Sequence, residues 1–303
     1  KVIPATLKVV DIAGIVAGAS KGEGLGNKFL AHIRETQAIL HVVRCFAGGD
    51  VTHVSGQVDP LADIGTIETE LVLADLETVE RAKERVAKKA RGNDKPGEAE
   101  LAACEKAPAH LRAGRPARTA TWTEAEAEVL GGLLLITAKP ILYVANVGED
   151  DLAGASPLVA TVRRHAAETG SEVVVLCAKL EQELAEMEPA DRKEFLADLG
   201  MERPGLDRLV QAAFHLLGLM TFFTAGPKEI RAWTIARGDS APKAAGAIHS
   251  DFEAHFIRAE IYSVQDLVEL KTEAAIRAAG RLRVEGRQYV MHDADVAHFL
   301  VGC

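Results

Sequence analysis

Four short apolar runs, each followed by a helical pattern, constrain the fold of this 303-residue chain more than any other feature. The runs are rich in Val, Ile and Leu, and they lie at Leu7–Val10, Ile39–Cys45, Ile141–Ala145 and Val173–Cys177. Continuous apolar runs of this length are typical of parallel strands buried on both faces, and their alternation with helical patterns indicates βαβ units. The sequence therefore predicts an α/β body with a mostly parallel sheet.

A helical pattern of unusual length separates the second run from the third. From about Asp63 to Ala90, apolar residues recur at spacings of three, four or seven, which is typical of an amphipathic helix. The pattern breaks at 92–97 and returns over Glu98–Arg112. A shorter helix is predicted over Asn27–Thr36, after a glycine-rich loop. The simplest interpretation is a helical hairpin, residues 78–137, inserted into a discontinuous domain that comprises residues 1–77 and 138–218.

The hairpin is basic, although the chain as a whole is acidic. The chain has 35 Lys and Arg against 44 Asp and Glu, a formal net charge of −9, but residues 81–118 hold 11 basic residues and only 5 acids. The overall charge argues against a protein built to bind nucleic acid over its whole surface, and no sequence-specific DNA binding is expected. The local charge makes Lys88, Lys89 and Arg91 candidate contacts to RNA.

The last third of the sequence has a different pattern. From about Met220, short alternating segments are separated by Gly, Asp and Pro, which predicts a small β-rich domain over residues 219–303. The predicted strands are Ile230–Ile235, Ile257–Ile261, Arg281–Val284, Gln288–Met291 and Val296–Leu300.

Cysteine spacing and hydropathy indicate the compartment. The four cysteines lie far apart, at positions 45, 104, 177 and 303, and form no C-x-x-C pair. Neither a zinc site nor a disulfide framework is indicated, and a reducing, cytoplasmic setting fits. No uninterrupted apolar run reaches the roughly 18 residues that would span a bilayer, so no membrane partner is expected.

Three predicted strand ends carry residues that suit a nucleotide. Asp11 ends the first run and Gly14 follows three residues later, the D-x-x-G arrangement that nucleoside triphosphatases place near the γ-phosphate and its Mg²⁺. Asn146 ends the third run, where P-loop GTPases carry N-K-x-D for the base, and Cys177 ends the fourth. Each feature is also ordinary turn chemistry by itself, but their order along the chain favours a nucleotide site.

The stretch from Val10 to Leu30, followed by His41–Phe46 and His53–Gly56, resembles the YchF-type Obg-like ATPases. Segments of the C-terminal part resemble the TGS domain of the same family: Phe223–Gly226, Arg231–Thr234, Ile248–Phe252 and Phe256–Ala259. The likeness covers essentially the whole chain. It implies a P-loop NTPase-type α/β fold with a helical-hairpin insertion and a β-grasp-like C-terminal domain. It also implies a cytoplasmic ATP-hydrolysing switch that uses Mg²⁺ and binds the ribosome through ribosomal RNA.

The phosphate-binding motif of that family is not in the sequence. No G-x-x-x-x-G-K-[ST] occurs among the 303 residues, so we expect an N-terminally truncated chain that is inactive as given. The alternative is a non-catalytic ribosome or RNA adaptor that keeps the fold without a P-loop.

The base-binding positions argue against GTP. In N-K-x-D the Asp accepts hydrogen bonds from guanine, but here Val147 and Glu149 occupy the Lys and Asp positions. An Asn amide can meet adenine's amine and ring nitrogen in a bidentate manner. The resemblance implies an ATP preference, with Asn146 and the Val147 backbone at the adenine.

Two further positions depart from common patterns. Ile15 follows D-x-x-G where Ras-like GTPases carry a water-orienting Gln, and the resemblance points to His53 as the substitute. The surface-loop interpretation of His53 stays open. In the TGS domain Ala294 occupies the glycine of the family's Asp-Gly-Asp-Val turn, which would be strained in a left-handed conformation.

Overall fold

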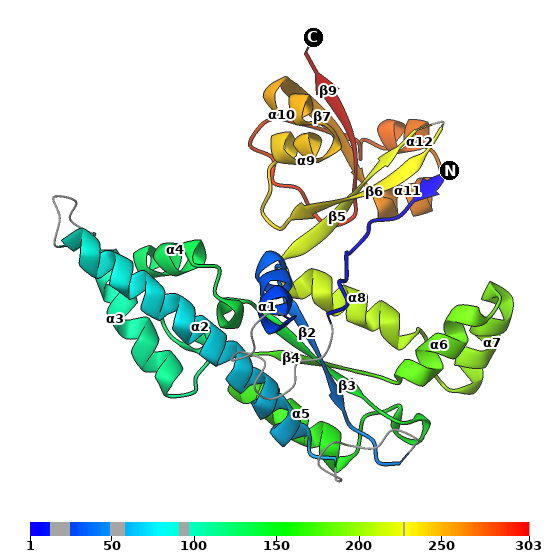
Figure 1. Ribbon diagram of the computed structural model, residues 1–303. Coiled ribbons are helices and arrows are strands. Elements are labelled where there is room, and N and C mark those ends of the chain that lie inside the picture. The colour runs from blue at the N-terminus through cyan, green and yellow to red at the C-terminus, as the bar shows by residue number, and fades with distance from the viewer. Residues whose placement is uncertain (13–24, 49–57, 91–96, 227, 303) are drawn as a thin grey trace. The chain divides into compact units, whose positions relative to one another are not determined.

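The computed structural model describes residues 1–12, 25–48, 58–90, 97–226 and 228–302. The chain divides into two compact units, one of Val10–Ala213 and one that joins Lys1–Val9 to Phe214–Cys303. Figure 1 shows both units and labels most of their helices and strands. Within the described parts of the chain, no helix combines the length and the apolar character that a membrane span requires.

The larger unit is built on a three-stranded parallel sheet with the order β2-β3-β4. The strands are β2 (Ile39–Arg44), β3 (Ile141–Asn146) and β4 (Glu172–Leu176), which confirms three of the four predicted runs. Five of the six residues of β3 are buried, as expected for a central parallel strand. Arg44 pairs with Asn146, and Asn146 pairs with Leu176. The carboxyl ends of all three strands therefore lie at one edge of the sheet.

The prediction of a strand at Leu7–Val10 is wrong. Among the described residues of the larger unit, no strand pairs with this segment, and Val9 and Val10 have exposed side chains. An apolar run becomes a strand only where a neighbouring strand supplies backbone hydrogen bonds, and periodicity carries no information about that neighbour. The N-terminal strand is instead β1 (Val2–Ile3), which belongs to the smaller unit and pairs there in parallel with β6 (Ile230–Ala236).

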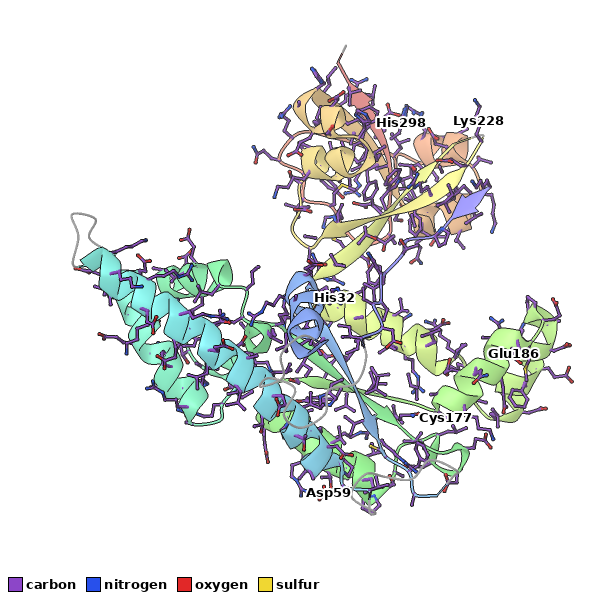
Figure 2. All side chains as sticks on the ribbon, in the orientation of Figure 1. His32, Asp59, Cys177, Glu186, Lys228 and His298 are labelled. Carbon is purple, nitrogen blue, oxygen red and sulfur yellow. The ribbon has the colours of Figure 1, made fainter. Side chains whose placement is uncertain are left out.

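Two long helices form the predicted hairpin. Helix α2 (Pro60–Ala90) begins where Asp59 accepts hydrogen bonds from the backbone N–H groups of Leu61 and Ala62. Figure 2 labels Asp59 at this end of α2. Pro60 stands at the first helical position, where a missing N–H costs nothing. Helix α3 (Glu98–Arg112) has the predicted bounds. The two helices and α4 (Glu124–Gly132) share an apolar core: Val72, Val79, Ala103, Ala107, Leu111 and Leu130.

Five further helices pack around this sheet. Helix α1 (Leu25–Glu35) precedes β2, α5 (Pro157–Glu168) follows β3, and α6 (Ala178–Glu186), α7 (Pro189–Asp198) and α8 (Gly205–Leu216) follow β4. The larger unit ends within α8, at Ala213. Short 3-10 turns lie between α3 and α4 (η2, Ala117–Thr119), between α4 and β3 (η3, Ile136–Ala138) and between β3 and α5 (η4, Glu149–Asp151). One face of the sheet packs against α2, α5, α6 and α7 through Ile64, Val159, Leu180 and Leu196.

A polar cluster ties the hairpin to the central strand. Glu68 of α2 accepts a hydrogen bond from the Tyr143 hydroxyl of β3 at 3.0 Å and forms an ion pair with Arg118 of η2. The Tyr143 hydroxyl also lies 3.2 Å from Nε2 of His165 on α5. His41 of β2 stacks beside the Tyr143 ring, and burial lowers the pKa of His41 to about 4. Because the ring is neutral at physiological pH, it packs as an aromatic group.

The smaller unit is a six-stranded mixed sheet with the order β1-β6-β5-β9-β7-β8. Its remaining strands are β5 (Leu219–Ala225), β6 (Ile230–Ala236), β7 (Phe256–Ser263), β8 (Arg283–Glu285) and β9 (Asp295–Val301). Its helices are α9 (Ala241–Ile248), α10 (Ser250–Ala254), α11 (Val264–Leu270) and α12 (Glu273–Ala278). The β-rich prediction is correct, but the predicted strand at Gln288–Met291 is wrong, since it forms only a bridge between Val290 and Ser240.

Ala294 adopts the left-handed conformation that a glycine would favour. Its φ is +66°, and its N–H donates to the Thr221 carbonyl at 2.8 Å. The neighbouring Asp293 carboxylate accepts from the Thr221 N–H at 2.9 Å. These bonds between the turn and β5 hold the backbone in place although the Ala294 Cβ disfavours it.

Replacing Ala294 with glycine should therefore raise the free energy of unfolding by about 0.5–1 kcal/mol, after the extra backbone entropy of glycine is subtracted. Chemical denaturation of the parent and variant measures the change. Ala274 is exposed on helix α12 and gives a matched control. Ala274→Gly should lower stability by about 0.5–1 kcal/mol. A destabilised Ala294→Gly variant would contradict the strain argument.

Candidate nucleotide-base site

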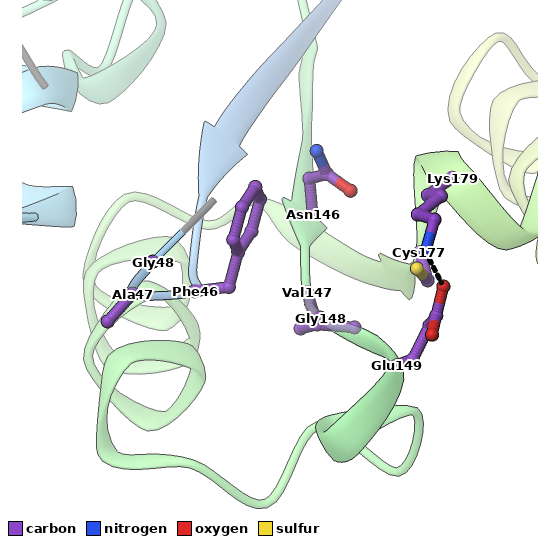
Figure 3. A pocket seen from close by; sticks show the side chains of 9 residues that line it. All are labelled: Phe46, Ala47, Gly48, Asn146, Val147, Gly148, Glu149, Cys177 and Lys179. Carbon is purple, nitrogen blue, oxygen red and sulfur yellow. Dashed lines mark ion pairs between the residues drawn. The ribbon is translucent and has the colours of Figure 1, made fainter. Parts of the chain in front are cut away.

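A pocket of about 260 Å³ lies where the three parallel strands end. Ligands of open α/β sheets bind outside the carboxyl ends of the strands, so this is the expected place for one. Figure 3 shows the lining residues at the ends of β2 and β3 and the start of α6. They are Phe46, Ala47, Gly48, Asn146, Val147, Gly148, Glu149, Cys177 and Lys179. Four of the candidate residues, Asn146, Val147, Glu149 and Cys177, are thus brought together.

Asn146 is held by the start of helix α6. Its Oδ1 atom accepts a hydrogen bond from the Ala178 N–H at 2.9 Å. Since an N–H donor requires an acceptor, this contact fixes which end of the amide is oxygen. The Nδ2 group is therefore the donor that Asn146 can offer to a base. The bidentate contact expected from the sequence would need Oδ1 to accept a second hydrogen bond.

Val147 occupies the position of the lysine in the guanine-binding pattern. Its side chain is only 2% exposed and belongs to the apolar core of the larger unit. Its N–H donates to the Leu176 carbonyl at 2.9 Å. A lysine here would place its aliphatic stem in that core and would have to bring its ammonium group out to water. The local packing therefore suits an apolar residue.

Glu149 is paired across the pocket with Lys179. The carboxylate Oε1 and the Lys179 Nζ atom are 2.7 Å apart, drawn as the dashed line in Figure 3. This hydrogen bond to Glu149 raises the pKa of Lys179. Both side chains are more than half exposed, so the pair is a weak surface interaction that positions the carboxylate. Cys177, by contrast, is buried at the end of β4 and labelled in Figure 2.

Five lining residues were not predicted from the sequence: Phe46, Ala47, Gly48, Gly148 and Lys179. Phe46 follows the end of β2 by two residues, and Lys179 follows β4 by three. Position after a strand end is therefore the signal that could have found them. Phe46 matters most, because a partly buried aromatic ring at a pocket wall offers a stacking surface.

The remaining candidate residues are placed less completely. Asp11 is exposed, and Gly14, His53 and Arg91 lie outside the residues that the structure describes. Among the described residues, no group of three or more His, Cys, Asp or Glu side chains could hold a metal ion. A Mg²⁺ ion bound to a nucleotide needs few protein ligands, because phosphate and water supply most of its coordination. The exposed Asp11 carboxylate is chemically suited to be one of them.

The hairpin carries less unpaired positive charge than its composition indicates. Lys88 and Lys89 are exposed on α2, as expected for a solvent-facing basic surface. Several basic side chains are already paired with acids: Arg81 with Glu77, Lys89 with Glu100, Lys106 with Glu126, Arg112 with Glu80 and Arg118 with Glu68. Acids outside residues 81–118 supply four of these five pairs. The net charge of residues 81–118 therefore overstates the positive electrostatic field around the hairpin.

Comparison with known proteins decides the family. A ribosome-binding ATPase YchF of Bacillus subtilis (strain 168) is 50% identical over 301 residues, which are 99% of this chain and 82% of the relative. This chain belongs to the YchF family. Its YchF relatives also include the ribosome-binding ATPase of Haemophilus influenzae (strain ATCC 51907 / DSM 11121 / KW20 / Rd), 49% identical over 99% of this chain and 82% of the relative.

Structure and family models agree with this assignment. A solved YchF GTPase of Schizosaccharomyces pombe matches with a TM-score of 0.85 and 37% identity, over 99% of this chain and 81% of that one. Residues 2–88 match a family model described as "50S ribosome-binding GTPase". Residues 219–302 match the model of the YchF GTPase C-terminal region, described as "Protein of unknown function (DUF933)". The predicted fold class is therefore confirmed.

Proposed function

We propose that this YchF chain belongs to an ATP-hydrolysing switch that binds the ribosome and prefers ATP to GTP. The names of the relatives divide between ATPase and GTPase, so they do not identify the preferred nucleotide. Two features of the base pocket support ATP: Val147 is buried where the guanine pattern has lysine, and Glu149 is paired with Lys179. The relatives' names also favour an enzyme over the alternative of a non-catalytic adaptor.

The proposed base contacts follow from the donors and acceptors in the pocket. Asn146 Nδ2 would donate to ring nitrogen N7, which adenine and guanine share. The two bases differ at position 6, where adenine has an amine donor and guanine a carbonyl acceptor. We assign the Val147 carbonyl to the adenine amine. Because Glu149 is held by Lys179, its carboxylate would not accept hydrogen bonds from guanine's ring N–H and exocyclic amine. Phe46 would stack on the base.

The proposed contacts to the phosphates rest on the resemblance to the YchF family. Asp11 would hold Mg²⁺ directly or through water, and Gly14 would offer its N–H to the γ-phosphate. The ion, when bound, neutralises charge on the phosphate oxygens. The 303 residues contain no G-x-x-x-x-G-K-[ST] motif, so we propose that this chain alone neither binds ATP tightly nor hydrolyses it.

His53 is proposed to orient the attacking water. His53→Ala should lower the turnover number of the complete gene product by about tenfold or more, because a positioned acid or base contributes about 10²–10⁴-fold in favourable cases. The affinity for ATP should change little, since the contribution arises in the transition state. Steady-state hydrolysis and equilibrium ATP binding measure the two quantities. An unchanged turnover number would show that His53 does not take part in hydrolysis.

The basic hairpin is proposed to contact ribosomal RNA. Replacing Lys88, Lys89 and Arg91 with Glu should weaken ribosome binding by about tenfold or more and reduce its salt dependence, because fewer counterions are released. Co-sedimentation with ribosomes over a series of salt concentrations gives both values.

The matched control for the hairpin variant reverses three exposed basic residues elsewhere in the larger unit, Arg164, Lys193 and Arg203. The change in net charge is the same. If the control loses as much ribosome binding as the hairpin variant, overall charge explains the effect and the hairpin has no special role.

A further inference from the structure

The Phe46 wall of the base pocket is held in place by one arginine. Arg44, the last residue of β2, donates from Nε to the Phe46 carbonyl at 3.2 Å and from Nη2 to the Gly48 carbonyl at 2.7 Å. Its guanidinium carbon also lies 4.6 Å from the centroid of the Phe46 ring. One side chain therefore contacts both the backbone of this loop and the aromatic ring that lines the pocket.

The loop needs such support because it leaves the sheet. The Cys45 N–H donates to the Asn146 carbonyl at 2.8 Å, and β2 ends at the residue before it. Gly48 then has a φ of +89°, a conformation that glycine adopts readily. A short segment that contains a glycine can adopt many conformations and strongly prefers none of them. The two Arg44 hydrogen bonds select the one in which the Phe46 ring lines the pocket.

We propose that Arg44 is a positioning residue for the nucleotide base. It orders the Phe46–Gly48 loop and fixes the Phe46 ring in advance, so that a purine can stack on it. The assignment rests on the proposed function of the pocket. This matters because a loop that becomes ordered only on binding costs free energy and so lowers the affinity.

The geometry requires arginine rather than a positive charge. A guanidinium is planar and has donors pointing in fixed directions, so it can reach two carbonyls while lying against a ring. An ammonium group of lysine is a compact point charge without a stacking face. If Arg44 acted by attracting phosphate, lysine would substitute for it. As a positioning residue, Arg44 cannot be replaced in this way.

The smaller unit provides a matched control. Arg287 donates from Nη1 to the Phe256 carbonyl at 2.8 Å, and its guanidinium lies 5.9 Å from the centroid of the Phe256 ring. This repeats the Arg44 arrangement, an arginine bound to the carbonyl of the phenylalanine that it covers. Arg287→Ala should therefore lower the melting temperature about as much as Arg44→Ala does. It should leave the affinity for ATP unchanged.

The test measures competition by ATP and by inorganic tripolyphosphate against a fluorescent ATP analogue on the complete gene product. Phe46→Ala should weaken ATP by about 10- to 100-fold, the scale of a lost base–aromatic stack. Arg44→Ala and Arg44→Lys should each lower the affinity for ATP by about tenfold. The affinity for tripolyphosphate should stay within about twofold of the parent value, because only the pocket wall that contacts the base is disturbed. The double variant Arg44→Ala/Phe46→Ala should bind ATP about as Phe46→Ala does, because the two residues act as a unit.

The possible failures are distinguishable. A parent protein that does not bind ATP, or a Phe46→Ala variant that binds it normally, would overturn the proposed base site and the Arg44 assignment with it. If that site is intact, the Arg44 assignment alone is overturned by normal ATP affinity in either Arg44→Ala or Arg44→Lys. It is also overturned if the Arg44 variants lose as much affinity for tripolyphosphate as for ATP, or if the two effects add in the double variant.

Discussion

Asn146→Ala is expected to weaken ATP binding to the complete gene product by about 1–3 kcal/mol, roughly 5- to 150-fold. Two contacts are lost together. The Nδ2 donor that we propose for the purine disappears, and the Ala178 N–H at the start of α6 loses its acceptor. Equilibrium titration with ATP measures the change.

Asn146→Asp separates these two contacts. The aspartate keeps an oxygen for the Ala178 N–H but replaces the Nδ2 donor with a second acceptor, which repels N7 of the base. If Asn146 binds the base, ATP affinity should fall at least as far as in Asn146→Ala. Recovery of normal affinity in Asn146→Asp would show that the residue serves only to hold α6.

The largest loss of stability is expected at Asp75. Its carboxylate is fully buried, with Oδ1 accepting from the Ile136 N–H at 2.9 Å and Oδ2 accepting from the N–H and the hydroxyl of Thr137, each at 2.7 Å. Arg34 lies 3.8 Å away as its counter-charge. Asp75 therefore ties α2 to the η3 turn that leads into β3.

Asp75→Ala should lower the free energy of unfolding by about 3–5 kcal/mol, because buried donors lose their acceptor and Arg34 loses its partner. Urea denaturation, followed by a probe in the larger unit, measures the loss. Glu84 is an exposed acid on the same helix and serves as the control. Glu84→Ala should change stability by no more than about 0.5 kcal/mol. A loss below about 1 kcal/mol for Asp75→Ala would contradict the account of this network.

Periodicity predicted the elements that carry the site. The buried runs at 39–45, 141–145 and 173–177 became β2, β3 and β4, and the stripe over 63–90 became α2. These patterns succeed because a fully buried strand or a long amphipathic helix leaves a strong repeat in the sequence. The register of a parallel sheet then places the strand ends together, which is why Asn146 and Cys177 share a pocket.

Other features depend on partners that the sequence does not show. Leu7–Val10 has a strand-like composition, but no described strand of the larger unit pairs with it. Phe46 reaches the pocket through a loop whose conformation Arg44 selects. The charge of the hairpin depends on pairs such as Arg118 with Glu68, which are 50 residues apart. Local patterns cannot specify contacts across such distances in the chain.

The most direct test of the proposed ATP preference is competition of ATP and GTP against a fluorescent ATP analogue. The complete gene product should prefer ATP by about tenfold or more, the scale of one mismatched base contact. The 303-residue chain, measured in parallel, should show no micromolar binding of either nucleotide. Equal affinities for the two nucleotides, or a preference for GTP, would contradict the assignment of Asn146, Val147 and Glu149 to adenine.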